Sequence, residues 1–180
     1  MTRSPERFLT AIVPTFNEEA NIRDCLASLS FADEILVVDS FSTDRTVELA
    51  RSVPKVRVLQ HAYEGNGPQC NWAMDQASHP WILIVDADER VTQPLASEIE
   101  ALLAAGPPAD LYRLRRENIF LGRPLRGSGW GRDRLVRLLR RFNQLLGGFS
   151  VRSRWLERQE FFEHGDSLWN RVRCTKVRNA

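Results

Sequence analysis

Short apolar runs alternate with amphipathic segments along much of the chain, and this alternation predicts strands that are followed by helices. Residues 81–85 form an unbroken apolar run, as expected of a strand buried on both faces of a sheet. Residues 9–14, 34–39 and 56–60 are expected to be further strands. Because the connections are short, the prediction is an α/β fold with a mostly parallel central sheet flanked by helices and with right-handed crossovers.

Four helices are expected next to these strands. The first carries an apolar stripe at i, i+3, i+4 and i+7 spacing, made of Ile22, Cys25, Leu26 and Leu29. The second follows Ser42 or Thr43, either of which is expected to cap it. The third covers residues 68–77, and the fourth begins after its cap Thr92 and ends at Gly106.

The length of the chain and its composition limit the possible architectures. With 180 residues and 43% hydrophobic content, one α/β domain with one substantial core is expected. No apolar run approaches the roughly 18 residues of a transmembrane helix, and the N-terminus lacks the apolar core of a signal peptide, which predicts a cytoplasmic protein. The widely spaced Cys25, Cys70 and Cys174 indicate reduced thiols, because they form no C-x-x-C pair.

Two further strands are expected at residues 111–121 and 134–139, in a strongly basic region. Residues 113–141, called the arginine block below, contain ten arginines and only two acids. The ten are Arg113, Arg115, Arg116, Arg123, Arg126, Arg132, Arg134, Arg137, Arg140 and Arg141. Such a surplus attracts polyanions, namely phosphorylated lipid, a membrane surface or nucleic acid. The alternative is that these arginines point in several directions and pair with acids elsewhere.

Polar side chains follow three of the expected strands. They are Thr15, Asn17 and Glu18 after the first, Asp39, Ser40 and Ser42 after the second, and Asp86 and Asp88 after the fourth. Parallel strands bring their carboxyl ends to one edge of the sheet, and α/β proteins bind ligands at that edge. The sequence therefore predicts one binding site that these residues share.

Asp86 and Asp88 are the candidate metal ligands. Residues two apart in extended backbone share a face, so their carboxylates are expected to close on one divalent cation. The alternative for this short D-x-D pattern is a strand that ends in an acidic, solvated turn.

Four motifs, in this order, resemble family 2 glycosyltransferases of GT-A fold. They are A-I-V-P-T-F-N-E-E, I-L-V-V-D-S-x-S-T-D-R-T, G-N-G-P-Q-C-N-W-A and V-D-A-D-E-R. The later segments Y-R-L-R-R-E-N-I-F-L-G-R and G-W-G-R-D-R-L-V-R-L are similar to a subgroup that includes lipopolysaccharide core glucosyltransferases. The resemblance spans residues 8–141, so it implies a GT-A domain over 1–141 whose segment 111–141 forms the acceptor side.

The resemblance implies a role for each residue that matches a motif. The implied nucleotide-sugar-binding residues are Pro14, Thr15, Asn17, Glu18, Asp39, Ser40, Gln69, Asn71 and Asp86. Asp39 would accept the uracil imide N–H, a charge-assisted hydrogen bond. Asp88, with Asp86 in the ribose or metal shell, would bind Mg²⁺ or Mn²⁺. The subgroup often has a basic residue at the position of Cys70.

The implied reaction is inverting transfer of a sugar from a nucleotide sugar, with UDP as the expected nucleotide, to a hydroxyl of the acceptor. Asp133 is the candidate general base, and the alternative is a surface aspartate paired with Arg132 or Arg137. The acceptor side is expected to include Trp130, Arg132 and Arg137. The implied acceptor is a glycan, a lipopolysaccharide core or a phosphorylated lipid-linked molecule, bound at the cytoplasmic face of the inner membrane, and no nucleic-acid partner is expected.

Residues 142–180 depart from the family pattern. This atypical tail is either a short variant of the acceptor side or the product of a truncated or frame-shifted reading frame. A second functional hypothesis is therefore a catalytically silent module that binds a nucleotide sugar or a polyanion. A nucleotidyltransferase is less favoured, because the N-terminal loop lacks a glycine-rich basic signature for triphosphate.

Overall fold

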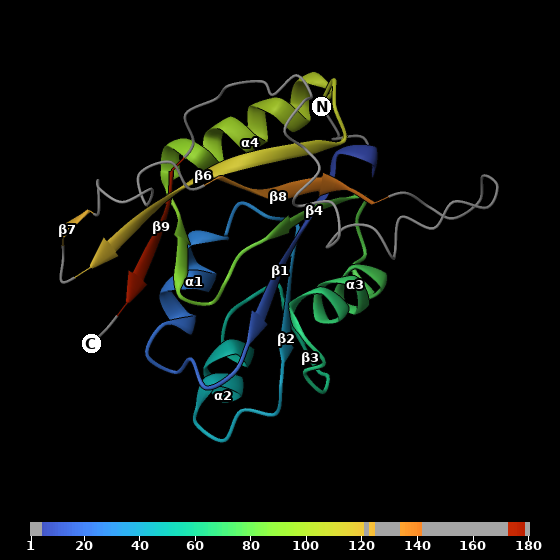
Figure 1. The fold of residues 1–180 in the computed structure, drawn as a ribbon. Helices are drawn as coiled ribbons and strands as arrows, with labels where there is room; N and C mark the ends of the chain where they lie inside the picture. Colours follow the sequence, from blue (N-terminus) through green and yellow to red (C-terminus); the bar gives the residue numbers. More distant parts are fainter. Residues whose placement is uncertain (1–4, 121–122, 125–133, 142–172, 179–180) are drawn as a thin grey trace.

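In the part of the chain that the structure describes, nine strands form one mixed sheet (Figure 1). The computed structural model describes residues 5–120, 123–124, 134–141 and 173–178. The strands are β1 (Leu9–Thr15), β2 (Glu34–Asp39), β3 (Val56–Gln60), β4 (Trp81–Ile84), β5 (Glu89–Val91), β6 (Leu111–Phe120), β7 (Arg123–Pro124), β8 (Arg134–Arg140) and β9 (Arg173–Arg178). The helices are a short 3-10 turn (Pro5–Arg7), α1 (Ile22–Ser28), α2 (Thr46–Arg51), α3 (Asn66–Gln76) and α4 (Gln93–Ala105).

The first half of the sheet is parallel, as the sequence predicts. Its strands lie in the order β3-β2-β1-β4, and each neighbouring pair runs parallel. The register places Thr15 beside Asp39 and Asp39 beside Gln60, so the carboxyl ends of β1, β2 and β3 are level with one another. The α/β class and the shared edge are therefore confirmed.

The second half of the sheet is mostly antiparallel and extends it beyond β4. β8 pairs antiparallel with β4 and with β6, and β9 lies parallel to β6 and antiparallel to β5. The strands expected at 111–121 and 134–139 are confirmed as β6 and β8. β5 and β9 were not predicted, because β5 is only three residues long and the sequence of β9, R-C-T-K-V-R, has no alternating apolar period.

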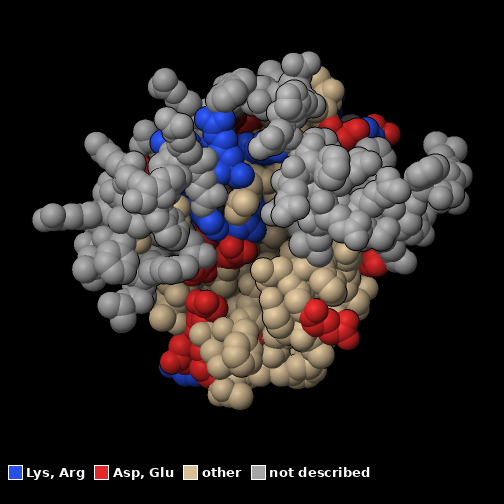
Figure 2. All heavy atoms as spheres, viewed as in Figure 1, with Lys and Arg blue, Asp and Glu red and all other residues tan. Residues whose placement is uncertain are grey.

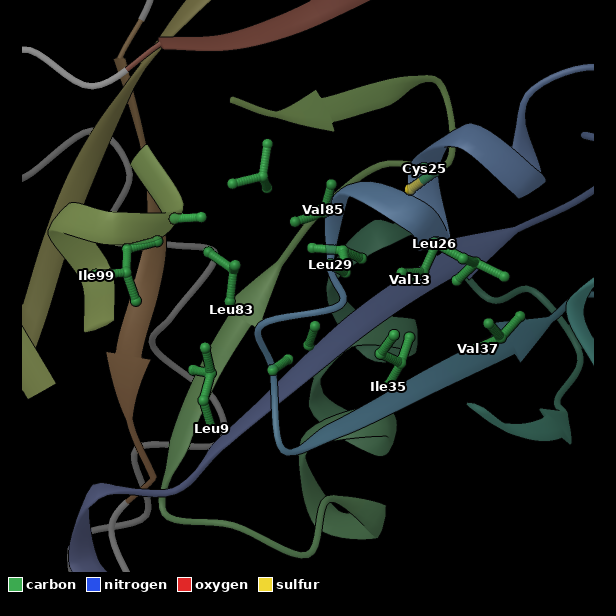
Figure 3. Close-up of a cluster of buried hydrophobic side chains, with 14 of the residues drawn as sticks. Leu9, Val13, Cys25, Leu26, Leu29, Ile35, Val37, Leu83, Val85 and Ile99 are labelled. Atoms are coloured by element: carbon green, nitrogen blue, oxygen red, sulfur yellow. The ribbon is translucent and has the colours of Figure 1, made fainter. Parts of the chain in front are cut away.

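Two apolar cores lie on the two faces of the sheet. On one face, helices α1, α2 and α4 pack on β1, β2 and β4, and Figure 3 shows Leu9, Leu83 and Val85 among these buried side chains. On the other face, α3 covers Ile82 and Ile84. Side chains of the run 81–85 therefore enter both cores, which confirms a strand buried on both faces.

The start of α2 differs from the prediction. Neither Ser42 nor Thr43 caps this helix, which begins at Thr46. Ser42 instead binds Asp39, and the Thr46 amide donates to Asp44 Oδ1 at 2.9 Å. Ser42 therefore does not cap α2, because its amide and hydroxyl bind Asp39 within the loop.

Glu34, at the amino end of β2, joins three segments at the edge opposite the polar loops. Its carboxylate accepts from Thr10 Oγ1 at 2.7 Å, from the Ser78 amide and hydroxyl at 2.9 Å, and from Arg57 Nε at 3.0 Å. Burial alone would raise the pKa of Glu34, but these hydrogen bonds outweigh it and lower the pKa below its usual value.

A lowered pKa predicts that Glu34 stabilises the fold above its unfolded-state pKa and that this stabilisation disappears as the pH falls. Urea unfolding of wild type and Glu34→Gln from pH 7 to pH 3 should show the largest difference in the free energy of unfolding near neutrality. The two curves should converge only once the pH has fallen below the lowered folded-state pKa of Glu34, where the glutamate is protonated in both states. A constant difference across this range would contradict the assignment.

Candidate functional site

The loops that follow β1 and β2 are bound to each other at the carboxyl edge of the sheet. The Ser40 amide donates to the Thr15 carbonyl at 2.9 Å, and the Asn17 amide donates to Ser42 Oγ at 2.8 Å. Asn17 Oδ1 accepts from the Thr43 amide at 2.8 Å. Asn17 has a φ of 53°, in the left-handed region that asparagine tolerates better than most residues. The predicted Thr15, Asn17 and Ser40 therefore belong to one rigid rim.

Glu18 is a further predicted residue of this rim, and the Thr15 side chain has a feature of its own. The Glu18 amide donates to Thr46 Oγ1 at 2.7 Å, and its carboxylate accepts from Asn21 Nδ2 at 2.8 Å. Thr15 is 6% exposed, and within the described chain its buried hydroxyl oxygen has no hydrogen-bond partner. A buried hydroxyl of this kind is costly unless a ligand or water completes it. Pro14 precedes it on β1.

Asp39 is completely buried at the end of β2. Its Oδ2 accepts from the Ser42 amide at 3.0 Å and from Gln60 Nε2 at 3.1 Å, and its Oδ1 accepts from the Ser42 hydroxyl. A nucleobase that binds Asp39 must therefore displace Gln60 or Ser42. Gln60 is the more exposed of the two.

Helix α3 contributes Gln69, which is 1% exposed. Its Nε2 donates to Ser40 Oγ at 3.1 Å, and its Oε1 lies 2.9 Å from His61 Nδ1. The His61 ring stacks on Trp72 with ring centroids 4.2 Å apart. Sequence reasoning missed His61 and Trp72, although His61 directly follows β3, where a site residue is expected.

The other two residues of interest on α3 are Asn71 and Cys70. Asn71 is partly buried on the same helix. Burial raises the pKa of Cys70 to about 11, so this side chain is a neutral thiol at physiological pH. It therefore carries no charge with which to bind an anion.

The acids after β4 lie on a turn and not on extended backbone. β4 ends at Ile84, and the Glu89 amide closes the turn by donating to the Asp86 carbonyl at 2.8 Å. The premise that Asp86 and Asp88 share the face of a strand is therefore wrong. Both side chains are partly exposed on the turn between β4 and β5.

Arg137 of β8 binds Asp86 through two hydrogen bonds. Nη1 lies 3.1 Å from Asp86 Oδ1, and Nη2 lies 2.6 Å from Oδ2. The same Nη2 also donates to Glu89 Oε1 at 3.1 Å. Arg116 of β6 donates to that Glu89 oxygen at 3.2 Å and lies 3.9 Å from Asp86 Oδ2. These four side chains are called the ion cluster below.

Glu89 is the most buried member of the ion cluster, at 1% exposure. Burial raises the pKa of Glu89; Arg137 opposes this shift and the nearby Asp86 carboxylate increases it. Its Oε2 accepts from the Asp86 amide at 3.1 Å, so Glu89 also holds the turn. The sequence analysis assigned no role to Glu89 or Arg116. For Glu89, the signal that could have indicated a role is its place as the third acid of D-A-D-E.

The turn is also connected to the rim. Arg90 Nη2 donates to Asn21 Oδ1 at 3.4 Å, and Asn21 in turn binds Glu18. The Cys25 thiol, whose pKa burial raises to about 12, lies 3.7 Å from the Asp86 carbonyl. All three predicted polar clusters therefore meet at one edge.

The arginine block does not form one face. Arg116 and Arg137 turn to the ion cluster, Arg140 lies 3.8 Å from Asp110, and Arg141 donates to the Met74 and Ala77 carbonyls. Arg115 and Arg134 are directly opposite in the β6–β8 register, and Arg113 lies two residues from Arg115 on the same face. These three are called the arginine face below.

Basic and acidic side chains lie next to each other on the face of the protein shown in Figure 2. Lys and Arg side chains gather there in one area beside a group of Asp and Glu side chains.

The predicted Asp133, Trp130 and Arg132 lie outside the described residues, and so does most of the tail 142–180.

The donor atoms on the β4–β5 turn suit a hard divalent cation. Asp86 and Asp88 offer carboxylate oxygens, and Mg²⁺ is commonly held by one or two carboxylates together with phosphate and water oxygens. The described residues contain no cluster of three His, Cys, Asp or Glu side chains that would hold a metal by themselves. On their chemistry, two carboxylates fit a metal whose remaining ligands are phosphate and water oxygens.

Comparison with known sequences identifies relatives. The profile of Glycosyl transferase family 2 matches residues 10–174. Lipopolysaccharide core biosynthesis glycosyltransferase LpsC of Rhizobium meliloti is 33% identical over 141 residues, which are 76% of this chain and 52% of LpsC. An uncharacterized glycosyltransferase of Rickettsia bellii is 38% identical over 98 residues, 33% of its length. The chain thus spans about half or less of the curated relatives it matches.

Solved structures share the fold. Staphylococcus aureus TarS 1–349 in complex with UDP-GlcNAc matches with a TM-score of 0.54 and 27% identity, over 67% of this chain and 37% of that chain. Glucosyl-3-phosphoglycerate synthase from Mycobacterium tuberculosis, in complex with Mn²⁺ and UDP, matches with a TM-score of 0.50 and 25% identity, over 64% of this chain and 45% of that one. The expected GT-A fold is confirmed.

No helix in the described ranges is both long enough and apolar enough to cross a bilayer.

Proposed function

The chain belongs to glycosyl transferase family 2, and from this membership we propose that it transfers a sugar from a UDP-sugar to a hydroxyl of a glycan acceptor, with inversion at the anomeric carbon. The observation that carries this proposal is the single edge at which the rim and the D-A-D turn meet. Thr15 and Ser40 lie on the rim, and Arg90 and Asn21 connect the rim to the turn. TarS 1–349, whose fold is similar to that of this chain, has been solved in complex with UDP-GlcNAc.

The rim is assigned to the nucleoside. Asp39 would accept the imide N–H of uracil once Gln60 moves aside, since a buried carboxylate binds such a donor strongly. The unsatisfied Thr15 hydroxyl, the Asn17 loop and the α3 residue Gln69 would contact the nucleoside and the diphosphate. Pro14, Glu18, Ser40 and Asn71 complete this donor-binding set.

The chemistry is assigned to the turn. Asp86 and Asp88 would hold Mg²⁺ or Mn²⁺, which supplies positive charge to the leaving diphosphate. The acceptor oxygen attacks the anomeric carbon as the bond to the diphosphate oxygen breaks, and UDP leaves. A carboxylate takes the acceptor proton, and Asp133 is the proposed base. Residues 1–141 form the proposed catalytic domain, and 142–180 form the proposed atypical tail.

The arginine face is assigned to the acceptor. Arg115 and Arg134 lie directly opposite each other in the β6–β8 register, so two guanidinium groups project from neighbouring positions of the sheet. Guanidinium groups bind phosphate bidentately, so we assign to this face a phosphorylated, lipid-linked acceptor of the lipopolysaccharide-core type. The proposed location is the cytoplasmic face of the inner membrane, with Trp130 and Arg132 on the acceptor side. Arg137, which was expected there too, instead binds Asp86 and Glu89 at the turn.

Binding of the protein to anionic vesicles should depend on the arginine face. Each basic residue near an anionic surface contributes roughly 1 kcal/mol, so Arg113→Gln, Arg115→Gln and Arg134→Gln together should reduce partitioning about 100-fold at low salt. Co-sedimentation with phosphatidylserine vesicles at low and high salt measures this effect, and salt should weaken the wild-type binding.

The matched control removes three exposed arginines, one in α1, one in α2 and one just before α2, and it changes the net charge equally. Arg23→Gln, Arg45→Gln and Arg51→Gln should keep most of the vesicle binding. Equal losses in the two triple variants would show that binding follows net charge and not the arginine face.

The test of the proposed function is UDP binding followed by turnover. Calorimetric titration with UDP and Mn²⁺ should show binding that EDTA abolishes. An assay with UDP-glucose, UDP-galactose and UDP-GlcNAc against lipid-linked acceptors should then release UDP. Binding without turnover would favour the silent module, release of pyrophosphate would favour a nucleotidyltransferase, and absence of nucleotide binding would overturn the proposal.

A further inference from the structure

The ion cluster contains equal numbers of acidic and basic side chains. Its two acids, Asp86 and Glu89, face two arginines, Arg116 and Arg137. Glu89 is 1% exposed, Arg137 13% and Arg116 18%, whereas Asp86 is 38% exposed. The two arginines therefore pair with Asp86 and Glu89, and Asp88, the third acid of the turn, is not part of this cluster.

Arg137 occupies the carboxylate that a metal would need. Both Asp86 oxygens accept from its guanidinium, and the closer one lies 2.6 Å from Nη2. A divalent cation that binds Asp86 without a nucleotide competes with this guanidinium for the carboxylate oxygens. It is also repelled by the positive charges of Arg137 and Arg116. The free protein is therefore arranged against binding of the metal alone.

Glu89 keeps Arg137 in the site after such a displacement. Nη2 of Arg137 is shared between Asp86 and Glu89, and its distance to Glu89 Oε1 is 3.1 Å. If the bonds to Asp86 break, the guanidinium stays attached to a buried acid beside the turn. A diphosphate bound there offers the planar, anionic partner that a guanidinium prefers.

We propose that Arg137 is a positioning residue that binds Asp86 in the free protein and moves to the diphosphate when the nucleotide and the metal arrive together. This inference rests on the proposed function, and it names the device that makes metal binding depend on the nucleotide. The metal then binds Asp86 tightly only in the presence of UDP, because UDP supplies the partner that Arg137 needs in exchange for Asp86. The two ligands are thereby positively coupled.

The experiment measures Mn²⁺ binding with and without UDP, so its readout is binding and not activity. In the absence of nucleotide, Arg137→Gln should bind Mn²⁺ at least about 10-fold more tightly than wild type, as followed by the electron paramagnetic resonance signal of free Mn²⁺. In the presence of Mn²⁺, the same variant should bind UDP at least about 10-fold more weakly, as measured by calorimetry. If Arg137 had a purely structural role, its loss would weaken both Mn²⁺ binding and UDP binding. Tighter Mn²⁺ binding together with weaker UDP binding therefore identifies the exchange of Arg137 from Asp86 to the diphosphate.

Two further variants keep the test interpretable. Arg137→Lys retains the charge but loses the two-bond geometry, and its Mn²⁺ affinity should fall between those of wild type and Arg137→Gln; it serves alone if the glutamine variant fails to fold by circular dichroism. Arg140→Gln removes an exposed arginine of the same strand that faces Asp110, and it should change neither affinity.

The outcomes separate this inference from the proposed function. If wild type binds UDP with Mn²⁺ but Arg137→Gln and Arg137→Lys bind Mn²⁺ alone no more tightly than wild type, the inference is overturned and the proposed function stands. If wild type binds UDP under no condition, the proposed function itself fails, and the inference falls with it.

Discussion

Replacement of Asp88 by asparagine is expected to reduce Mn²⁺-dependent UDP binding about 100-fold or more. Asparagine keeps the size of the side chain and one oxygen ligand but loses the negative charge, and charge is what hard divalent cations require of a carboxylate ligand. Asp88 is partly exposed on the β4–β5 turn, so the fold should remain intact. Calorimetric titration of UDP with Mn²⁺ or with EDTA measures the loss, and circular dichroism checks the fold.

A matched control for this substitution is Asp110→Asn. Asp110 is a half-exposed acid just before β6 that faces Arg140 and not the turn. Its replacement should leave UDP binding unchanged with either Mn²⁺ or EDTA. If Asp88→Asn bound UDP and Mn²⁺ as tightly as wild type, the metal would have to be held elsewhere, and the assignment of the turn would be wrong.

The elements that the sequence predicted are those whose signal is local. The apolar run 81–85 identifies a strand buried on both faces, and the parallel direction of β1, β2 and β3 follows from their short helical crossovers. The polar clusters after these strands are brought together by topology alone. Sequence reasoning could therefore place Thr15, Ser40 and Asp86 at one edge without knowing any side-chain contact.

The contacts that were missed depend on residues far apart in the chain. Arg137 reaches Asp86 because β8 pairs with β4. The hydrophobic periodicity of neither segment indicates that the two strands are neighbours. His61 was not assigned because its partners Gln69 and Trp72 belong to a helix that starts after a loop. The extended geometry assumed for Asp86 and Asp88 failed for a related reason, since the hydrogen bonds of Glu89 close a turn at that point.

Removal of the Glu89 side chain is expected to cause the largest loss of stability among single substitutions at the site. Glu89→Ala leaves the guanidiniums of Arg137 and Arg116, which are 13% and 18% exposed, without the acid they share. The Asp86 amide also loses its acceptor. Breaking a buried ion pair from one side typically costs about 3 kcal/mol or more, which corresponds to a fall in Tm of roughly 6–12 °C for a protein of this size.

Urea and thermal unfolding of Glu89→Ala, Glu89→Gln and Glu48→Ala test this expectation. Glu89→Gln keeps the volume and an oxygen acceptor, so it should lose less stability than the alanine variant. Glu48 pairs with Arg45 on an exposed surface, and its removal should leave Tm nearly unchanged because water already screens that pair. If Glu89→Ala and Glu48→Ala unfolded at the same temperature, the ion cluster would contribute no net stability. Glu89 would then serve only to orient Arg137, and its loss would be visible in Mn²⁺ and UDP affinity alone.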